Sequence, residues 1–155
     1  MEEIRIRPAT PADIPHVLHH RQRMFAEMGK GTPAELETMA ATTAAYLREA
    51  MPAGRYRGWL AETAGARVVG GTGIAIAPWP GSPDDQSPRR GWILNVYTER
   101  EFRGRGIARR LMDTAVEWCR EEGFRSVALH ASEFGRPLYE KMGFVPTNEM
   151  RLKFP

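Results

Sequence analysis

The chain has 155 residues, of which 42% are hydrophobic and 26% charged, and its formal net charge at pH 7 is +3. This length and composition are typical of one globular domain with its own core. No apolar run reaches the roughly 20 residues that cross a bilayer, and the polar start MEEIRIRP is unlike a signal peptide. We therefore expect a cytoplasmic protein without a membrane partner. The single cysteine, Cys119, excludes an intramolecular disulfide and lies among apolar positions, as a core thiol would.

The positive charge comes mainly from arginine, because Lys30, Lys141 and Lys153 are the only lysines among the 22 cationic residues. Acidic residues are interleaved with these cations along most of the chain, and the excess is small. We therefore expect no nucleic-acid partner. The densest arginine cluster lies at residues 103–110, which points to a local anion instead.

The N-terminal third predicts one strand and two helices. Residues 3–7 alternate apolar and polar side chains, as a strand does. Each helix begins with Thr followed by Pro, a start that resembles a capping box. The first runs from Thr10 to Gly29 and the second from Thr32 to about Ala50.

The middle of the chain predicts three strands. Residues 56–62 and 68–77 form a hairpin that turns near Gly65. Residues 79–90 are rich in Pro and Gly and form a long loop, which in a small domain is usually functional or disordered. Residues 92–98, WILNVYT, are β-branched and aromatic and predict a buried strand.

The stretch FRGRGIARRL at residues 102–111 predicts a glycine turn that opens a helix. Gly104 and Gly106 permit positive φ and a close approach of the backbone to a ligand. An apolar pattern of helical spacing then continues to a stop near Gly123, so the helix begins at about Gly104. Its first amides lack intrahelical partners and lie at the positive end of the helix dipole, which favours a phosphate.

Four arginines flank this turn and can pair with phosphate oxygens. They are Arg103, Arg105, Arg109 and Arg110. A turn with a solvated basic face and no ligand is the alternative, and the glycines alone leave it open. The chain has no GxxxxGK[ST] loop, and a dinucleotide fingerprint would need a small residue in place of Arg109.

The C-terminal third predicts a strand at 126–132, a short helix that ends in residues 138–144, and a final strand within 144–154. The full order is β-α-α-β-β-β-α-β-α-β. Because neither a linker nor a repeat divides the chain, we predict one α+β domain around a mixed central sheet.

Two separated motifs resemble the GNAT acyltransferase superfamily. Residues 103–108, RGRGIA, match its Arg/Gln-x-x-Gly-x-Gly/Ala turn, and residues 138–144, LYEKMGF, match its LYEKxGF segment. The order of elements also agrees, so the resemblance covers essentially the whole chain and implies a single GNAT-like domain over residues 1–155. Members of this superfamily transfer an acyl group from acyl-coenzyme A to an amine. The resemblance therefore implies acetyl-CoA as the cosubstrate.

The same resemblance implies where the cofactor binds. The residues that it assigns to cofactor binding are Val96, Thr98, Arg103, Gly104, Arg105, Gly106, Ile107, Ala108, Arg109 and Ser132. The turn amides would hold the pyrophosphate of coenzyme A. The strand at 92–98 would splay from the strand at 126–132 and free backbone groups to pair with the pantetheine arm and orient the acyl carbonyl. Ser132 stands where the family often has Asn, and Gly135 where it often has Ala.

Tyr139 matches the family's usual proton donor to the departing thiolate. A phenol with a pKa of about 10 is protonated at neutral pH, so it can donate that proton. Simple packing of the ring against the last strand is the alternative. For the base, His130 could relay a proton through water, although a structural hydrogen bond between a buried Asn95 and His130 is the competing interpretation. Glu133 or solvent could also accept the proton.

The acceptor side is less defined by motifs. Met24, Phe25 and Met28 recur at helical spacing and form either a pocket wall or part of the core. The loop at 79–90, with Asp84 and Asp85, is a candidate cover that attracts a cationic amine; solvated loop acids are the alternative.

Two histidines of the first predicted helix raise the question of a metal. His16 and His20 lie one turn apart, but no other ligands have the required spacing. We therefore predict exposed residues and no metal site.

These observations favour an N-acetyltransferase that transfers acetyl from acetyl-CoA to a primary amine by direct attack in a ternary complex. The acceptor is a small-molecule or protein amine. A coenzyme A-binding regulator without turnover and a basic nucleic-acid-binding domain are the alternatives. The oligomeric state is not encoded in these motifs, and a homodimer stays open.

Overall fold

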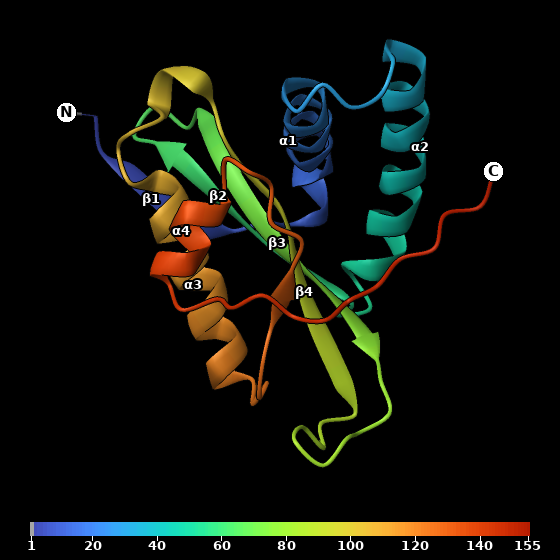
Figure 1. The fold of residues 1–155 in the computed structure, drawn as a ribbon. Helices are drawn as coiled ribbons and strands as arrows, with labels where there is room; N and C mark the ends of the chain where they lie inside the picture. Colours follow the sequence, from blue (N-terminus) through green and yellow to red (C-terminus); the bar gives the residue numbers. More distant parts are fainter. Residues whose placement is uncertain (1) are drawn as a thin grey trace.

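A five-stranded sheet in the order β1-β2-β3-β4-β5 forms the centre of the computed structural model, which describes residues 2–155 (Figure 1). The strands are β1 (Ile4–Pro8), β2 (Tyr56–Thr63), β3 (Val68–Pro78), β4 (Arg89–Thr98) and β5 (Ala128–Leu129). The first four strands pair antiparallel, and β5 pairs parallel to β4. The prediction of an α+β domain with a mixed sheet is therefore confirmed.

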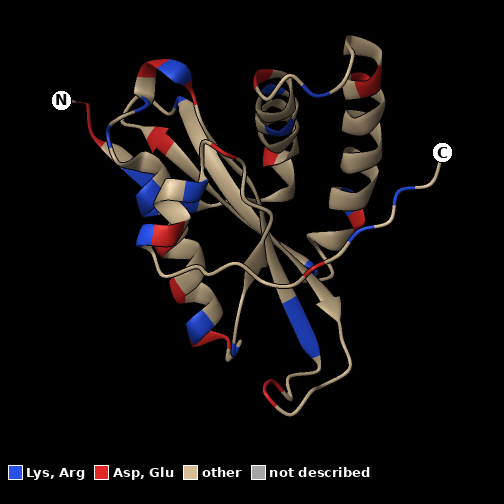
Figure 2. Cartoon of the chain, in the orientation of Figure 1, with Lys and Arg blue, Asp and Glu red and all other residues tan. Residues whose placement is uncertain are grey.

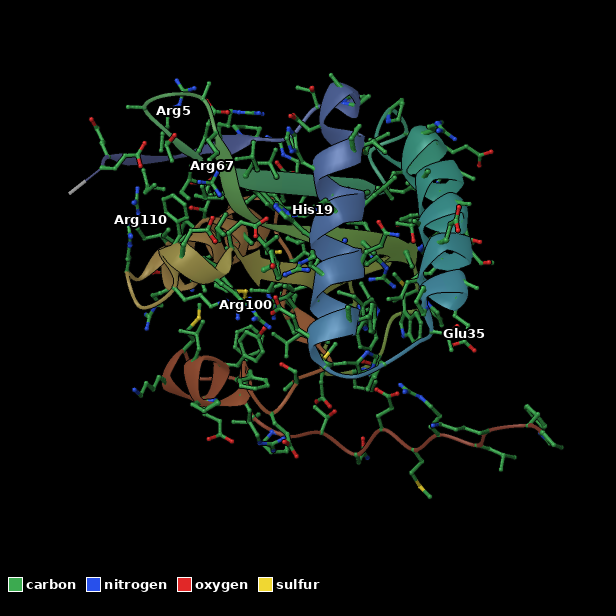
Figure 3. All side chains as sticks on the ribbon, turned by 90° about the horizontal axis from the view of Figure 1, so that it is seen from above. Arg5, His19, Glu35, Arg67, Arg100 and Arg110 are labelled. Carbon is green, nitrogen blue, oxygen red and sulfur yellow. The ribbon has the colours of Figure 1, made fainter. Side chains whose placement is uncertain are left out.

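Helices cover both faces of this sheet. The helices are α1 (Ile14–Glu27), α2 (Pro33–Ala50), α3 (Ile107–Glu121) and α4 (Arg136–Lys141), with short 3-10 turns at Pro11–Asp13 and Arg100–Phe102. Figure 1 shows α1 and α2 on one side of the sheet and α3 and α4 on the other. Seen from above, α1 crosses over the strands with α2 beside it (Figure 3). Among residues 2–155, no helix is both long and apolar enough to cross a membrane.

Apolar side chains from the two faces of the strands form two clusters, one under each helical layer. Successive residues of β4 show the alternation, since Ile93 belongs to the cluster under α3 and Leu94 packs against the cluster under α1 and α2. From α3, Leu111, Met112 and Cys119 are buried. Burial raises the pKa of the Cys119 thiol to about 11, so it is a packed core thiol as predicted.

Charged side chains are interleaved on the outside of the fold. Figure 2 shows basic and acidic segments alternating along α3 and around the turn before it. On α3, Arg109 pairs with Asp113 and Arg120 with Glu117, each about one turn apart. Exposed pairs of this kind contribute little to stability. Their alternation nevertheless differs from the continuous basic stripe that binds a nucleic-acid duplex.

Several predicted boundaries shift for local physical reasons. The strand expected at 126–132 is reduced to the two residues of β5, because only these pair with β4. The helix expected to begin at about Gly104 begins at Ile107, because Gly104 and Gly106 both have positive φ, outside the right-handed helical region.

The final strand predicted within residues 144–154 is wrong. Within the described chain, no residue after Leu129 belongs to a strand. Met150, Leu152 and Phe154 alternate with charged residues as in a strand, yet all three are exposed. A strand requires a hydrogen-bonded neighbour as well as an alternating pattern, and this segment has none within residues 2–155.

An ion-pair network ties the N-terminal strand to the start of α1. Arg7 donates from both terminal nitrogens to Asp13, at 2.8 and 2.9 Å, and from Nε to Glu62 at 2.6 Å. Asp13 also accepts from the backbone N–H of Thr10 at 2.8 Å. The hydrogen bonds from Arg7, against the opposing effect of burial, lower the pKa of Asp13 to about 2. This network joins β1, β2 and the first helical turn at one point.

We predict that Asp13→Asn lowers the free energy of unfolding by about 2 kcal/mol at pH 7, because it removes a charged acceptor from two donors of Arg7 and two of Thr10. The pKa of Asp13 is lower in the folded state than its ordinary value of 3.8. Its stabilisation is therefore present above about pH 4 and is lost as the pH falls towards about 2. Urea unfolding at several pH values should show the two proteins converging in acid.

Asp84 provides the matched control, since it lies exposed in the loop between β3 and β4. Asp84→Asn should leave the unfolding midpoint unchanged. A loss of stability by Asp13→Asn that stays constant down to pH 2 would contradict the role assigned to the carboxylate.

Candidate active site

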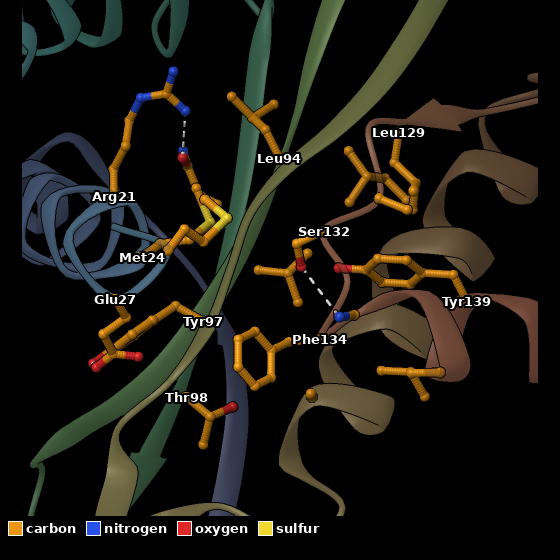
Figure 4. Close-up of a pocket in the computed structure, with 18 of the residues that line it drawn as sticks. Arg21, Met24, Glu27, Leu94, Tyr97, Thr98, Leu129, Ser132, Phe134 and Tyr139 are labelled. Carbon is orange, nitrogen blue, oxygen red and sulfur yellow. Dashed lines mark hydrogen bonds between the residues drawn. The ribbon is translucent and has the colours of Figure 1, made fainter. Parts of the chain in front are cut away.

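A cavity of about 900 Å³ opens where β4 and β5 separate. The two strands pair only at Trp92 with Ala128 and at Ile93 with Leu129. Beyond this point α1, β4, the glycine turn, the start of α3 and residues 129–139 line the cavity (Figure 4). Its volume is in the range of small-molecule and cofactor sites. The splay implied by the family resemblance is therefore present.

A bulge in β4 helps to shape this opening. Asn95 has φ +59°, and the register between β3 and β4 shifts opposite it. Its side chain accepts a hydrogen bond from Arg21 Nη1 at 2.9 Å and donates one to the Tyr56 hydroxyl at 3.1 Å. A Cβ at Gly73 would overlap that hydroxyl, so glycine is needed there. The bulge is thus held from α1 and from β2.

The predicted hydrogen bond between Asn95 and His130 is wrong. Asn95 is buried with the partners described above, whereas the His130 side chain is 62% exposed and follows the end of β5. His130 Nε2 lies 2.6 Å from Glu149 Oε2, and the ring stacks on Trp92 with centroids 5.5 Å apart. The strand separation that forms the cavity also moves these two residues apart. His130 still lies on the cavity wall.

The glycine turn presents free backbone to the cavity. Gly104 and Gly106 have φ +74° and +73°, and a Cβ at either position would meet no atom within 4 Å. Gly106 immediately precedes α3, and Ile107, Ala108 and Arg109 of its first turn line the cavity. The first amides of a helix lack intrahelical acceptors and lie at its positive end. This arrangement fits an anionic group such as a diphosphate.

Arg103 is exposed, yet its guanidinium is paired with groups of the protein. It donates from Nη2 to Glu27 at 2.6 Å and from Nε to the carbonyl of Thr98 at 2.8 Å. The Thr98 carbonyl is thus engaged, while its hydroxyl is buried in the cavity wall and has no hydrogen-bond partner among residues 2–155. An unpaired buried hydroxyl is costly unless a ligand satisfies it. Together with the open turn, it fits a polar cofactor arm.

The other predicted arginines of the turn take different directions. Arg105 donates to the carbonyl of Glu101 at 3.0 Å and does not line the cavity. Arg110 donates to the carbonyl of Ile4 at 2.8 Å, away from the opening. Arg109 lines the cavity and pairs with an aspartate one helical turn further along. The arginine cluster is therefore largely structural.

The Tyr139 ring is buried, and its hydroxyl points into the cavity (Figure 4). Burial raises its pKa, so the phenol stays protonated at neutral pH. A Cβ at Gly135 would lie 2.6 to 2.8 Å from three ring and hydroxyl atoms, so glycine makes room for this ring. Ser132 Oγ accepts from the Gly135 N–H at 3.1 Å. Both departures from the family pattern, Ser132 and Gly135, therefore lie beside Tyr139.

On the opposite wall, the cavity is lined by Met24 and Phe25 of α1 and by Met28, which follows the helix directly. The loop before β4 does not cover it: within the described residues, that loop lines a separate hollow, and Asp85 there pairs with Arg90. The prediction of a loop cover is therefore not supported by its position.

The expectation that His20 is exposed is wrong. It is buried between α1 and β3, and burial, with smaller effects from the neighbouring histidines, lowers its pKa to about 3. His20 is therefore neutral at physiological pH. His16, one turn earlier, stays exposed. The two side chains thus lie in different environments and do not form a pair of ligands.

Among the residues of the cavity wall that sequence reasoning missed are Arg21, Glu27 and Phe134. Arg21 shares the helical face of Met24 and Phe25, a spacing that was available in the sequence. Glu27 could not be recognised, because its partners Arg100 and Arg103 are more than 70 residues away. Phe134 is 88% exposed in a non-helical segment that carries no periodic signal.

Comparison with known proteins agrees with this geometry. The model of the GNAT acetyltransferase family matches residues 20–144. A crystal structure of a GCN5-related N-acetyltransferase from Ralstonia eutropha superimposes with a TM-score of 0.91 at 35% identity, covering 98% of this chain and 99% of that one. A predicted acetyltransferase from Clostridium acetobutylicum, crystallised with acetyl-CoA, has a TM-score of 0.87 at 27% identity and covers 99% and 96%.

Curated relatives match over shorter segments. The uncharacterized N-acetyltransferase YjgM of Escherichia coli is 37% identical over 89 residues, which cover 56% of this chain and 49% of that protein. Human N-acetyltransferase 8B is 29% identical over 94 residues, which cover 59% and 39%. The chain thus spans half or less of the length of these curated relatives.

The fold is that of an acetyltransferase domain. The chain belongs to the GNAT acetyltransferase family, as its two motifs predicted. Acetyl-CoA, the predicted cosubstrate, is the molecule with which the Clostridium acetobutylicum member was crystallised.

We predict that Gly106→Val abolishes measurable binding of coenzyme A. Valine is strained at φ +73°, and its side chain would occupy the open space in front of the first helical amides. Calorimetric titration with coenzyme A should show the loss, with circular dichroism confirming a folded protein.

Gly54→Val is the matched control. Gly54 has φ +71°, a Cβ there would also meet nothing within 4 Å, and it lies outside the cavity. This variant should lose similar stability and keep the affinity. Equal affinity of the two variants for coenzyme A would show that the glycine turn is not part of the binding site.

Proposed function

We propose that this protein transfers the acetyl group of acetyl-CoA to a primary amine by direct attack in a ternary complex. One observation carries the proposal: the Tyr139 hydroxyl and the open N-terminus of α3 line the same cavity, which begins where β4 and β5 separate. An anion site beside a buried phenol is what a coenzyme A thioester requires. The acceptor is a small-molecule or protein amine.

The cofactor would lie along the wall formed by β4 and the glycine turn. The amides of residues 104–109 would bind the diphosphate, with Arg109 adding charge. Val96 lines the cavity from β4, and the unpaired Thr98 hydroxyl would bind the pantetheine arm. Arg103 supports this wall through Glu27 and the Thr98 carbonyl rather than through direct contact. The bound thioester supplies an activated acetyl group.

The chemistry then needs two proton transfers. The neutral amine nitrogen attacks the thioester carbon, the C–N bond forms and the C–S bond breaks. Tyr139 donates its phenolic proton to the departing thiolate, and the new amide nitrogen loses a proton. The buried phenol suits the first transfer because burial raises its pKa and keeps it protonated.

His130 is the candidate acceptor of the second proton. It lies on the cavity wall, and the carboxylate of Glu149, 2.6 Å from its Nε2, would orient the ring. Nδ1 can then accept a proton through a water molecule. Glu133 is exposed and does not line the cavity, so solvent is the better alternative to His130.

We expect Tyr139→Phe to lower turnover by roughly 10²–10⁴-fold, the usual contribution of a positioned general acid, with little change in coenzyme A affinity. The ring and its packing stay, and only the proton donor is lost. Release of thiol from acetyl-CoA across a panel of amines measures the effect. The loss should shrink for a thioester with a more acidic leaving thiol.

Tyr46→Phe is the matched control, because Tyr46 is 40% exposed and lies outside the cavity. It should keep full turnover. Full turnover of Tyr139→Phe across the pH range would assign Tyr139 to packing. Coenzyme A binding without thiol release by any amine would favour a regulatory domain instead.

We also expect Gly135→Ala to reduce turnover by up to about 10²-fold, because its methyl group would displace the Tyr139 ring. Coenzyme A affinity should change little. Gly135 has negative φ, so alanine adds no backbone strain.

Gly65→Ala is the control for this substitution. A Cβ at Gly65 would approach only Thr63 Oγ1, at 3.8 Å, and neither residue lines the cavity. If Gly135→Ala and Gly65→Ala both keep wild-type kcat, the position of the Tyr139 ring is not critical.

A further inference from the structure

Arg21 places a cationic group in the wall of the cavity away from the glycine turn. It projects from α1 beside β4, across the cavity from Tyr139 (Figure 4). Its guanidinium lies over the ring of Phe25, 5.1 Å from the centroid, and donates from Nη1 to Asn95. These two contacts hold the planar group in one orientation.

The charge of Arg21 is not compensated by the protein. Within residues 2–155, no carboxylate oxygen lies within 4 Å of this guanidinium, and Nε is buried without a hydrogen-bond partner. Burial lowers the pKa of Arg21, as expected for a cation in an apolar wall. Desolvating a charge and leaving its donors unpaired is costly unless a ligand completes the site.

Glu27, on the same helix, shows the opposite situation. Its carboxylate lies within 4 Å of Arg23, Arg100 and Arg103, at 3.5, 3.3 and 2.6 Å, and also accepts from the Tyr97 hydroxyl. Arg100 and Arg103 near the glycine turn thus share a carboxylate, whereas Arg21 has none within 4 Å in the described part of the chain.

We propose that Arg21 binds a carboxylate of the acceptor, so that the substrate is an amine that also carries a carboxylate, as an amino acid does. This inference rests on the proposed acetyl transfer. A guanidinium with a free Nε edge binds a carboxylate through two parallel hydrogen bonds. That pairing satisfies the buried Nε and fixes the amine relative to the thioester.

The surroundings of Arg21 indicate the rest of the acceptor. Met24 and Phe25 line the cavity on α1, and Leu94 lines it on β4. Phe134 lines it from the segment before α4 and is 88% exposed. Apolar side chains beside the guanidinium of Arg21 favour an amino acid with an apolar side chain, such as phenylalanine, leucine or methionine.

Matched pairs of acceptors test the carboxylate directly. L-Phenylalanine, L-leucine and L-methionine are each compared with the amine that lacks the carboxylate, using thiol release from acetyl-CoA. We expect kcat/KM to be about 10- to 100-fold higher for the amino acid in at least one pair, the usual effect of a charge-assisted hydrogen-bond pair. Comparable values in all three pairs would overturn the proposal.

Two substitutions test whether any preference for the amino acid over the matching amine depends on Arg21. Arg21→Met should remove it by raising KM for the amino acid more than KM for the matching amine. Because Arg21 also donates to Asn95, the ratio of the two kcat/KM values within the variant is the readout. Arg48→Met is the control. Arg48 is exposed on α2, outside the cavity, and its substitution removes the same charge. A preference that survives Arg21→Met would overturn the assignment.

Product binding gives a readout independent of turnover. N-acetyl-L-phenylalanine, N-acetyl-L-leucine and N-acetyl-L-methionine are titrated with coenzyme A present, each against its analogue without the carboxylate. Selective binding of at least one acid, lost in Arg21→Met and kept in Arg48→Met, supports the proposal. Equal binding within every pair, or no binding of any acid, overturns it.

The turnover and binding experiments together distinguish a failure of the proposed acetyl transfer from a failure of the proposed carboxylate site. Selective acid binding without thiol release would contradict acetyl transfer and keep the carboxylate site. If every matched amine releases thiol with the same kcat/KM as its amino acid, the proposed acetyl transfer is supported and the proposed carboxylate site is contradicted.

Discussion

The separation of β4 from β5 is the constraint on which the site depends. After only two paired positions the strands part, and the side chains and backbone that would otherwise lie in the sheet border a cavity. A residue with positive φ inside a strand needs support from its surroundings. Asn95 receives it from Arg21 on α1 and Tyr56 on β2, and Gly73 leaves the space that Tyr56 needs.

The parts of the site that the sequence predicted are those encoded by local chemistry. Positive φ at Gly104 and Gly106 follows from a turn that only glycine enters readily, and the helix after it follows from apolar spacing. Tyr139, which lines the cavity, belongs to a contiguous motif. In each case a short stretch of chain contains both the signal and the structure that it specifies.

The predictions that were wrong concern features that depend on residues distant in the sequence. Polar residues in two apolar strands suggested a shared hydrogen bond, but Asn95 and His130 belong to strands that have already separated. The alternating pattern at residues 144–154 matched a strand, yet strand formation depends on a neighbour that the pattern does not specify. Burial of His20 likewise depends on the space above Gly71, which only the packing of α1 on β3 reveals.

The distribution of arginine shows why composition alone misplaces function. The arginines clustered at the glycine turn are largely paired with groups within the protein, and the turn itself presents free backbone at the start of α3. Arg21, by contrast, has no carboxylate within 4 Å among residues 2–155. Glu27 and Arg21 lie six residues apart on one helix, so α1 fixes the spacing between the paired carboxylate of Glu27 and the guanidinium of Arg21. A rigid helix is thereby suited to set how far an acceptor's carboxylate lies from the thioester.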